Sequence, residues 1–296
     1  MSSYHCRFPT KIGRLLQVSI TWLTGWLQIK NGVGIIPEGE TEVKRDAFRG
    51  CTDLKSVVIP QGITRISYSA FEDCTSLESI TIPDSVTRID TCAFCGCTAL
   101  TELTIPASVT KLGTSIFANC TSLKNMIIPN SVTEMGGAIV GGCTALTSIT
   151  LSDNLTSIGG RTFCECKSLT SVKIPEGITE IGDSAFEYCD SLTEIVLPET
   201  LVEISQRVFA SCPALTHITL PEGVKSLGNH SFACCSNLKS ITLSKGIRKI
   251  EPMTFLNCNA LETIYVPAKR KEHYVKRLPM NLHSKIVELE PTKRAK

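Results

Sequence analysis

The sequence predicts a repeat solenoid of stacked 23-residue coils, and three columns of residues predict it. The first column is aromatic and runs from Phe48 to Phe255 in steps of 23 residues, with Val140 at the one position that is not phenylalanine. A cysteine follows three residues after each of these ten positions, and a leucine follows three residues later again. A fixed period of roughly 20 to 29 residues marks a chain of stacked supersecondary units. The cysteines are Cys51, Cys74, Cys97, Cys120, Cys143, Cys166, Cys189, Cys212, Cys235 and Cys258.

Residues 1–35 do not match the repeat. Apolar residues between Ile12 and Leu27 recur largely at spacings of three and four, which is typical of an amphipathic helix. The first coil of a solenoid has an apolar flank that a terminal element must cover, so we interpret 1–35 as an N-terminal cap. A targeting segment is the alternative. Polar residues interrupt the apolar stretch, no small-residue cleavage site follows it, and it is too short to span a bilayer.

Residues 36–267 form the predicted leucine-rich repeat solenoid, with mainly short parallel strands and turns. In each coil a Leu-x-x-Leu-x-Ile pattern, such as Leu100, Leu103 and Ile105, predicts a short parallel strand with alternate residues facing out. Proline usually ends this strand, because it has no amide proton for the ladder. A second extended segment, such as Ile63 to Ile66, returns along the opposite wall and leads into the aromatic residue.

One coil departs from the pattern. Residues 136–142 read Gly-Gly-Ala-Ile-Val-Gly-Gly, so that Val140 replaces phenylalanine among four glycines. Glycine raises the entropic cost of ordering the chain, and the smaller side chain leaves volume unfilled. We therefore predict that 136–152 is the softest joint of the solenoid, that is, the segment that opens most easily. We call it the glycine-rich joint.

Residues 268–296 are predicted to form a basic C-terminal cap and tail. The pattern indicates a helical stretch from Lys269 to Leu278, before Pro279, and a closing strand at 285–289. Their apolar residues are sufficient to cover the last coil. From Pro291 onward the tail is predicted to be disordered.

The charge of the chain is unevenly distributed. Residues 1–35 carry four Lys or Arg and no acidic residue, and 268–296 carry nine against three. Subtraction from the totals of 30 basic and 28 acidic residues leaves 17 against 25 in 36–267, a net charge of −8. Basic ends on an acidic body do not make the extended positive face that nucleic-acid binding requires. We expect no nucleic-acid partner.

The cysteine column is predicted to point inward, because a buried free cysteine acts as a small hydrophobe. Its thiols are predicted to be reduced, because ten equivalent positions do not form a disulfide framework. Cys92, Cys95 and Cys97 have a spacing that resembles a metal site. Cys97 belongs to the column, and no fourth ligand is evident locally. We therefore predict no metal and no cofactor. A reactive or disulfide-forming role for Cys95 or Cys234 is left open.

The sequence does not indicate an enzyme. Its five histidines are dispersed, without the paired spacing of a metalloprotease helix. Neither a phosphate-binding Gly-x-x-x-x-Gly-Lys loop nor a Gly-x-Ser-x-Gly elbow occurs.

The outward positions of the predicted strands are the candidate binding residues. Most of them are serine or threonine, which suit an exposed strand without any function. Lys173, Glu194, Val196 and His217 depart from that pattern on adjacent strands and are expected to form one mixed patch. We predict that this patch contacts a partner.

The repeat units resemble those of BspA-like leucine-rich repeat proteins, also called the treponemal type. The units at 82–106 and 174–198 and the closing segment that begins at Ile264 carry the resemblance, which covers about 36–290. It implies a binding surface on bacterial or protist cells, where some members are adhesins. We predict a non-catalytic protein-interaction scaffold; the alternative is a cell-surface adhesin for host matrix proteins or glycans. The missing export signal favours the cytoplasm, whereas the resemblance favours the cell surface. The oligomeric state is left open.

Overall fold

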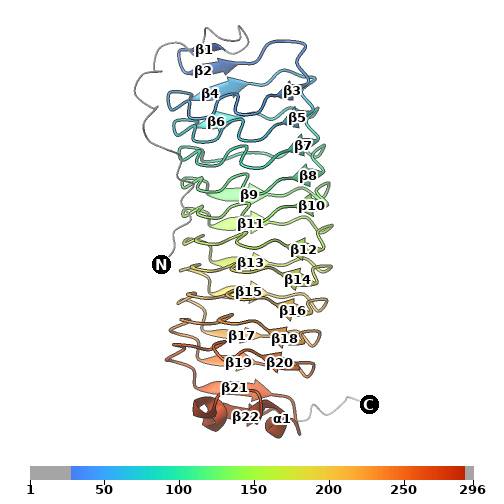
Figure 1. Cartoon of the computed structure of the whole chain (residues 1–296), viewed down its shortest axis with the longest axis vertical. Coiled ribbons are helices and arrows are strands. Elements are labelled where there is room, and N and C mark those ends of the chain that lie inside the picture. Colours follow the sequence, from blue (N-terminus) through green and yellow to red (C-terminus); the bar gives the residue numbers. More distant parts are fainter. Residues whose placement is uncertain (1–27, 291–296) are drawn as a thin grey trace.

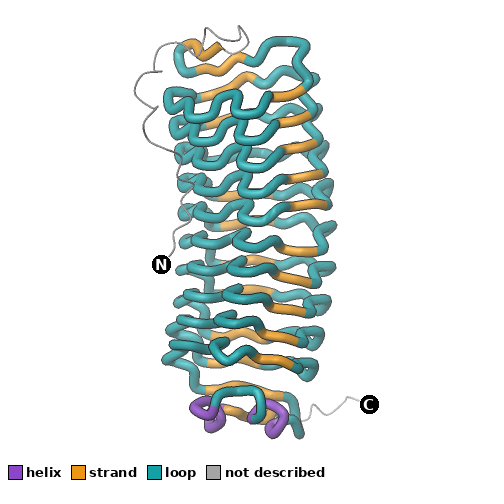
Figure 2. The backbone as a smooth tube through the Cα atoms, viewed as in Figure 1, coloured by secondary structure: helices purple, strands orange, loops and turns teal. Residues whose placement is uncertain are grey.

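The computed structural model describes residues 28–290 and confirms a β-solenoid of coils 23 residues apart with very little helix (Figure 1). Most coils contribute one strand to each of two stacks, and turns and loops connect them (Figure 2). We call the first stack the face sheet. Its strands are β2 (Val33–Ile35), β4 (Ser56–Val58), β6 (Ser79–Ile80), β9 (Asn125–Ile127), β11 (Ser148–Thr150), β13 (Ser171–Lys173), β15 (Glu194–Val196), β17 (His217–Thr219), β19 (Ser240–Thr242) and β21 (Thr263–Val266).

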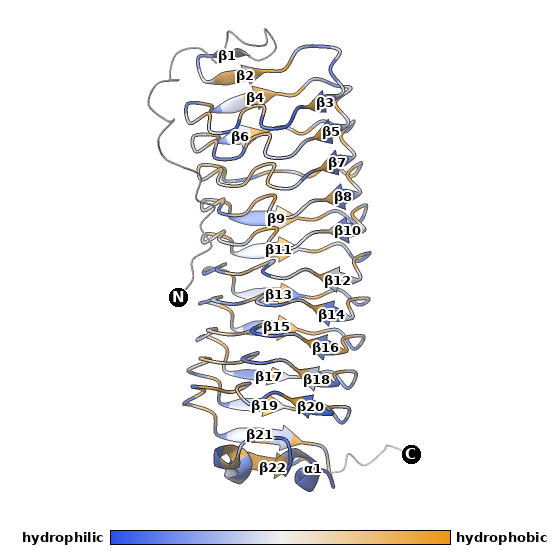
Figure 3. Cartoon of the chain, in the orientation of Figure 1, coloured by the Kyte–Doolittle hydropathy of each residue, from blue (hydrophilic) through white to orange (hydrophobic). Residues whose placement is uncertain are grey.

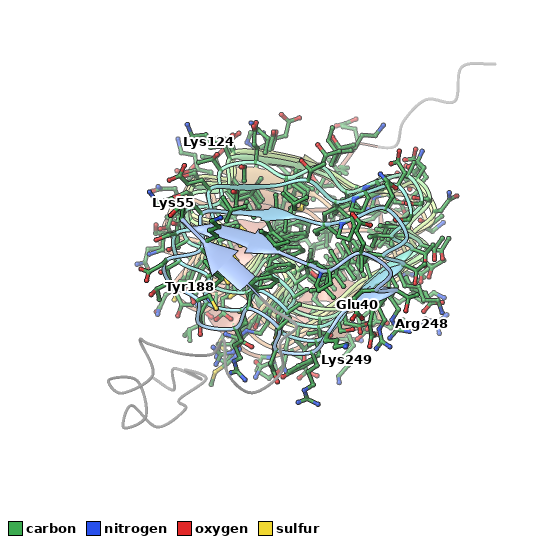
Figure 4. The ribbon with its side chains drawn as sticks, turned by 90° about the horizontal axis from the view of Figure 1, so that it is seen from above. Glu40, Lys55, Lys124, Tyr188, Arg248 and Lys249 are labelled. Carbon is green, nitrogen blue, oxygen red and sulfur yellow. The ribbon has the colours of Figure 1, made fainter. Side chains whose placement is uncertain are left out.

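We call the second stack the side sheet. Viewed along the long axis, Lys55 and Lys124, which precede face strands, lie away from Lys249 of side strand β20 and from the preceding Arg248 (Figure 4). Both stacks are parallel with a register of 23 residues, as in the pair Glu180↔Glu203. The side strands are β3 (Glu42–Val43), β5 (Arg65–Ile66), β7 (Arg88–Ile89), β8 (Lys111–Leu112), β10 (Glu134–Met135), β12 (Ser157–Ile158), β14 (Glu180–Ile181), β16 (Glu203–Ile204), β18 (Ser226–Leu227) and β20 (Lys249–Ile250).

The solenoid begins with a hairpin. Strand β1 (Gln28–Lys30) pairs antiparallel with β2 through a turn at Asn31 and Gly32, whose φ angles are 54° and 79°. Positive φ at both central residues defines the type I′ turn that suits a two-residue hairpin and favours Asn-Gly. Strand β2 pairs in parallel with β4, so the first rung of the face sheet lies within the segment interpreted as the cap. The amphipathic pattern at 12–27 lies outside the described residues.

The aromatic column forms two stacks of rings in the core. Consecutive centroids from Phe48 to Phe117 lie 5.2–5.6 Å apart, and those from Phe163 to Phe255 lie 4.8–5.8 Å apart, with interplanar angles of at most 20°. Val140 is fully buried between the two stacks. The single valine that the sequence shows in this column therefore divides the aromatic core into two parts.

The cysteine column is a ladder of hydrogen bonds as well as a set of small buried side chains. Each thiol from Cys74 to Cys258 donates to the backbone carbonyl of the aromatic-column residue of the preceding coil, at Sγ to O distances of 3.0–3.2 Å. Burial raises the pKa of every column thiol, for Cys143 and Cys212 to about 12. All ten are free thiols in the structure. The column therefore supplies neutral donors that link neighbouring coils.

The side sheet is interrupted at the glycine-rich coil. One five-stranded sheet ends at β10 and another begins at β12. The amide of Gly136 donates to the carbonyl of Leu112 at 3.0 Å and that of Gly182 to Ile158 at 2.9 Å. Within residues 28–290, the equivalent bond from Gly159 to Met135 is not formed. This interruption supports the prediction of a soft joint.

The segment that was predicted as the C-terminal cap contains α1 (Lys271–Val275), η2 (Met280–Lys285) and β22 (Ile286–Glu288). A closing strand was predicted at 285–289, and β22 lies there and pairs in parallel with β21. The helix is shorter than the predicted 269–278. Tyr274 is fully buried and its hydroxyl donates to the carbonyl of Ser244, which fastens the cap to the preceding coil. Most residues of α1 are hydrophilic (Figure 3). The predicted tail from Pro291 lies outside the described residues.

Candidate interaction surface

The four predicted binding residues all lie on the outer side of the face sheet. Lys173 ends β13, Glu194 and Val196 flank the centre of β15, and His217 begins β17. All four side chains are exposed, and Val196 retains 51% of its accessible surface. Strands place alternate residues on the same side, so these positions share the outer face while Val172 and Ile218 are buried beneath them.

The structure brings three of the four residues to one depression and places the fourth beside it. Lys173 is the register partner of Val196, so the lysine lies on the rung next to the valine. The depression has a volume of about 470 Å³ and separates β15 from β17. We call it the β15–β17 depression. Its lining includes Glu194, Val196, Glu199, His217, Thr219 and Glu222.

The depression coincides with an opening in the face-sheet ladder. Between β13 and β15 the amide of Thr193 donates to Thr170 at 2.9 Å, and the amide of Ile174 donates to Val196 at 3.2 Å. In the described chain, the equivalent bonds from Thr216 to Thr193 and from Leu197 to Thr219 are not formed, and β15 does not pair with β17. Unpaired strand groups are a template for another chain.

The charge around the depression is mainly acidic. Glu194, Glu199 and Glu222 are all exposed on its rim. The carboxylate of Glu222 accepts a hydrogen bond from the amide of Lys245 at 3.1 Å, which fixes its position. The ring Nδ1 of His217 lies 2.9 Å from the hydroxyl oxygen of Thr216. The depression thus combines open backbone groups, an exposed valine and a negatively charged rim.

A second depression on the face sheet was not predicted. It has a volume of about 600 Å³ and lies where the segment 102–104 forms no strand between β6 and β9, although the repeat predicts one there. Ile127, with 66% of its surface exposed, lies on its wall with Asp84 and Glu102. Glu102, Asn125 and Ile127 also depart from serine and threonine, so the criterion that selected the first patch could have found this one.

The three cysteines with metal-like spacing do not converge on one point. The thiol of Cys97 is buried and bonds the carbonyl of Phe71, whereas Cys92 and Cys95 are half-buried at the surface. Among residues 28–290 no group of three His, Cys, Asp or Glu side chains is arranged to hold a metal ion. In the same range no helix is long and apolar enough to cross a bilayer.

Comparisons with known proteins agree with the repeat architecture. The model of the BspA type leucine rich repeat region matches residues 41–170 and 156–275. A leucine-rich repeat protein of Bacteroides ovatus has a similar structure, with 27% identity, a TM-score of 0.74, and coverage of 90% of this chain and 73% of that one.

Two more distant structures share the fold. A leucine rich cell surface protein of Faecalibacterium prausnitzii is 24% identical with a TM-score of 0.53, over 90% of this chain and 93% of the other. A leucine-rich repeat protein of Eubacterium ventriosum is 20% identical with a TM-score of 0.53, over 80% of each chain. Curated protein sequences gave no match.

Proposed function

Because the chain belongs to the BspA type leucine-rich repeat family, we propose that it is a non-catalytic scaffold that binds another protein through its face sheet. Proteins of this repeat family and fold are typically non-catalytic, and leucine-rich repeat proteins generally bind proteins. The finer proposal concerns the place of binding. We assign it to the β15–β17 depression together with Lys173.

The face sheet is also unpaired between β11 and β13. The observation that carries this assignment is therefore the coincidence of an open ladder with the depression and its acidic rim. An extended peptide segment that enters the depression can donate to the free carbonyls of Thr193 and Thr219 and accept from the free amides of Leu197 and Thr216. Backbone hydrogen bonds of this kind supply affinity in strand addition, and side chains supply specificity. The depression therefore suits an extended segment of a partner.

The side chains around the depression define the chemistry of that segment. Three carboxylates on the rim favour a partner segment with lysine or arginine residues. Val196 offers an exposed β-branched contact for one apolar side chain of the partner. Lys173 lies one rung away, next to Val196. Its charge disfavours a basic residue of the partner segment at that position and so helps to fix the register in which the segment binds.

Differential capture tests the assignment. The wild-type protein, Glu194→Lys and Glu180→Lys are immobilised and exposed to native lysate and to the culture surroundings. Glu180 is an exposed glutamate on the side sheet, so its variant makes the same charge change away from the depression. We expect a protein that wild type and Glu180→Lys retain and Glu194→Lys loses. Equal capture by all three would reject the site.

Hydrogen exchange of the captured complex tests the mode of binding. We expect the amides of Leu197 and Thr216 to gain protection when the partner binds, because they become hydrogen-bonded. Unchanged exchange at both amides would exclude strand addition while leaving scaffold binding intact. The alternative of a surface adhesin differs in location, and fractionation of the native cells separates the two: exported protein supports the adhesin.

A further inference from the structure

We propose that Cys92 and Cys95 form a thiol–disulfide exchange site on the surface of the solenoid, with a small-molecule or protein disulfide as its substrate. The two residues are a Cys-x-x-Cys pair that the interaction surface does not use. Both are half-buried free thiols, unlike the buried column members beside them. This proposal does not depend on the proposed function.

Backbone geometry brings the two cysteines together. The amide of Cys95 donates to the carbonyl of Cys92 at 3.1 Å, so the two residues are the first and fourth of a tight turn. Such a turn holds its end Cα atoms within about 7 Å, a range that a disulfide spans. The two side chains are in hydrogen-bonding contact. Neighbouring coils fix the turn, through bonds of 2.9 Å from Cys92 to Thr114 and 2.8 Å from Asp73 to Cys95.

The other coils show that neither cysteine is needed for the fold. The position of Cys92 is filled by Ser69, Ser115 and Ser184 in other coils, in the same left-handed conformation. The position of Cys95 is filled by alanine in three other coils, by glutamate in two and by cysteine in one, at Cys164. Of the ten coils, this one alone has cysteine at both positions. A structural role in the column explains Cys97 and does not explain this pair.

The local environment selects Cys92 as the nucleophile. The hydrogen bond from Cys95 lowers the pKa of Cys92, partial burial opposes it, and Arg49 lowers it further while Glu72 and Asp73 raise it. The same hydrogen bond raises the pKa of Cys95, and its partial burial adds to the effect. A thiolate is the attacking species in disulfide exchange, so the thiol that ionises first attacks first.

The reaction is a two-step exchange. The Cys92 thiolate attacks one sulfur of a disulfide R–S–S–R′, forms the mixed disulfide Cys92–S–S–R and releases R′–S⁻, which takes up a proton. The Cys95 thiol then gives up its proton to solvent and attacks the Cys92 sulfur. The intramolecular disulfide forms and R–S⁻ leaves. The protein loses two electrons and two protons, and R–S–S–R′ gains two electrons and, with two protons from solvent, becomes R–SH and R′–SH.

Redox titration of the full chain in glutathione buffers tests the site. Free thiols are blocked after equilibration, and peptides are mapped by mass spectrometry. We expect a Cys92–Cys95 disulfide in the wild type while the column thiols remain free. In Cys95→Ser we expect a lasting mixed disulfide of glutathione on Cys92, because the resolving thiol is missing. In Cys92→Ser we expect Cys95 to remain a free thiol.

Cys234→Ser is the matched control, because Cys234 is an exposed single thiol in the same position of the repeat as Asp73. It is expected to leave the Cys92–Cys95 titration unchanged. Circular dichroism confirms that each variant is folded, and serine is already present at the equivalent of Cys92 in other coils. A wild-type protein in which Cys92 and Cys95 remain reduced, while Cys234 forms a glutathione adduct, would overturn the proposal.

Discussion

Two coils of the solenoid differ in side chains but share the same path. The coil around Phe186 has stacked rings on both sides, at 4.8 and 5.5 Å, and its side strand β14 pairs with both neighbours. The coil around Val140 interrupts the aromatic stack, and its side strand β10 pairs with β8 alone. The thiol ladder nevertheless continues through it, since Cys166 bonds the carbonyl of Val140 at 3.2 Å.

The difference separates what holds the register from what fills the core. The thiol ladder uses a backbone carbonyl as its acceptor, so it tolerates any residue in the aromatic column. The aromatic stack depends on the side chain itself and stops where the side chain changes. The coils therefore remain aligned at the glycine-rich joint, where the aromatic stack and the pairing of side strands β10 and β12 are both interrupted.

The largest expected effect is a loss of folding stability at alkaline pH. It affects both coils, because each contains a buried column thiol. An ordinary thiol has a pKa of 9.0, and burial raises it to about 12 for Cys143 and Cys212. A folded-state pKa above the unfolded value means that the stabilisation is complete below pH 9 and is lost as the pH rises toward 12. Each pH unit in that window costs about 1.4 kcal/mol per thiol. Denaturant titrations at rising pH should show a steep loss of stability; a flat profile to pH 11 would contradict the buried thiol column.

The second-largest expected effect is the loss of unfolding free energy when either aromatic-column residue is changed to alanine. We expect Phe186→Ala to lower the free energy of unfolding by about 3–5 kcal/mol, because it leaves a cavity between two rings. We expect Val140→Ala to cost less, since fewer atoms are removed and no ring is stacked on it. Urea titration monitored by circular dichroism measures both. Equal losses at the two positions would show that the joint is packed as well as the rest.

The columns could be predicted from the sequence because each depends on one residue type at one spacing. The period and most strand positions follow from Phe48, Cys51, Leu54 and their repeats, whereas the closing strand follows from the local pattern at 285–289. The acceptor of the thiol hydrogen bonds could not be predicted from the sequence, because every residue has a backbone carbonyl, whatever its side chain. The ladder opening at β15–β17 depends on the spacing between coils, which the periodic pattern does not encode. The hairpin at Asn31 and Gly32 was not predicted, although the Asn-Gly pair favours a two-residue hairpin turn.

A smaller loss of stability is expected where a glycine of the glycine-rich joint lies close to the backbone of the next coil. A Cβ atom added to Gly137 would lie 2.6 Å from the carbonyl oxygen of Gly160, and one added to Gly141 would lie 3.1 Å from that of Arg161. We expect Gly137→Ala to cost about 1–3 kcal/mol because backbone must shift. Gly141→Ala, the control in the same coil, is expected to cost less. Thermal unfolding ranks the two, and the reverse order would contradict the geometry.

The smallest effect tests the thiol ladder as a set of donors. Cys189 bonds the carbonyl of Phe163 at 3.2 Å. Cys189→Ala removes the donor and leaves a small cavity, for a loss of about 1–2 kcal/mol. Cys189→Ser keeps a donor and is expected to be no more destabilising than alanine. If serine is clearly worse, the column acts only through its hydrophobicity.

The central claim is that coils of the same path stabilise one another by stacking, and that this stacking is weakest at the glycine-rich joint. Hydrogen exchange across the two coils tests it most directly. The amides of Val140 and Phe186 make equivalent bonds, at 3.1 Å to Thr162 and 2.8 Å to Val208. Any difference in their exchange therefore reports the free energy of local opening. We predict that 136–152 exchanges measurably faster than 182–198. Equal protection of the two segments would contradict the account.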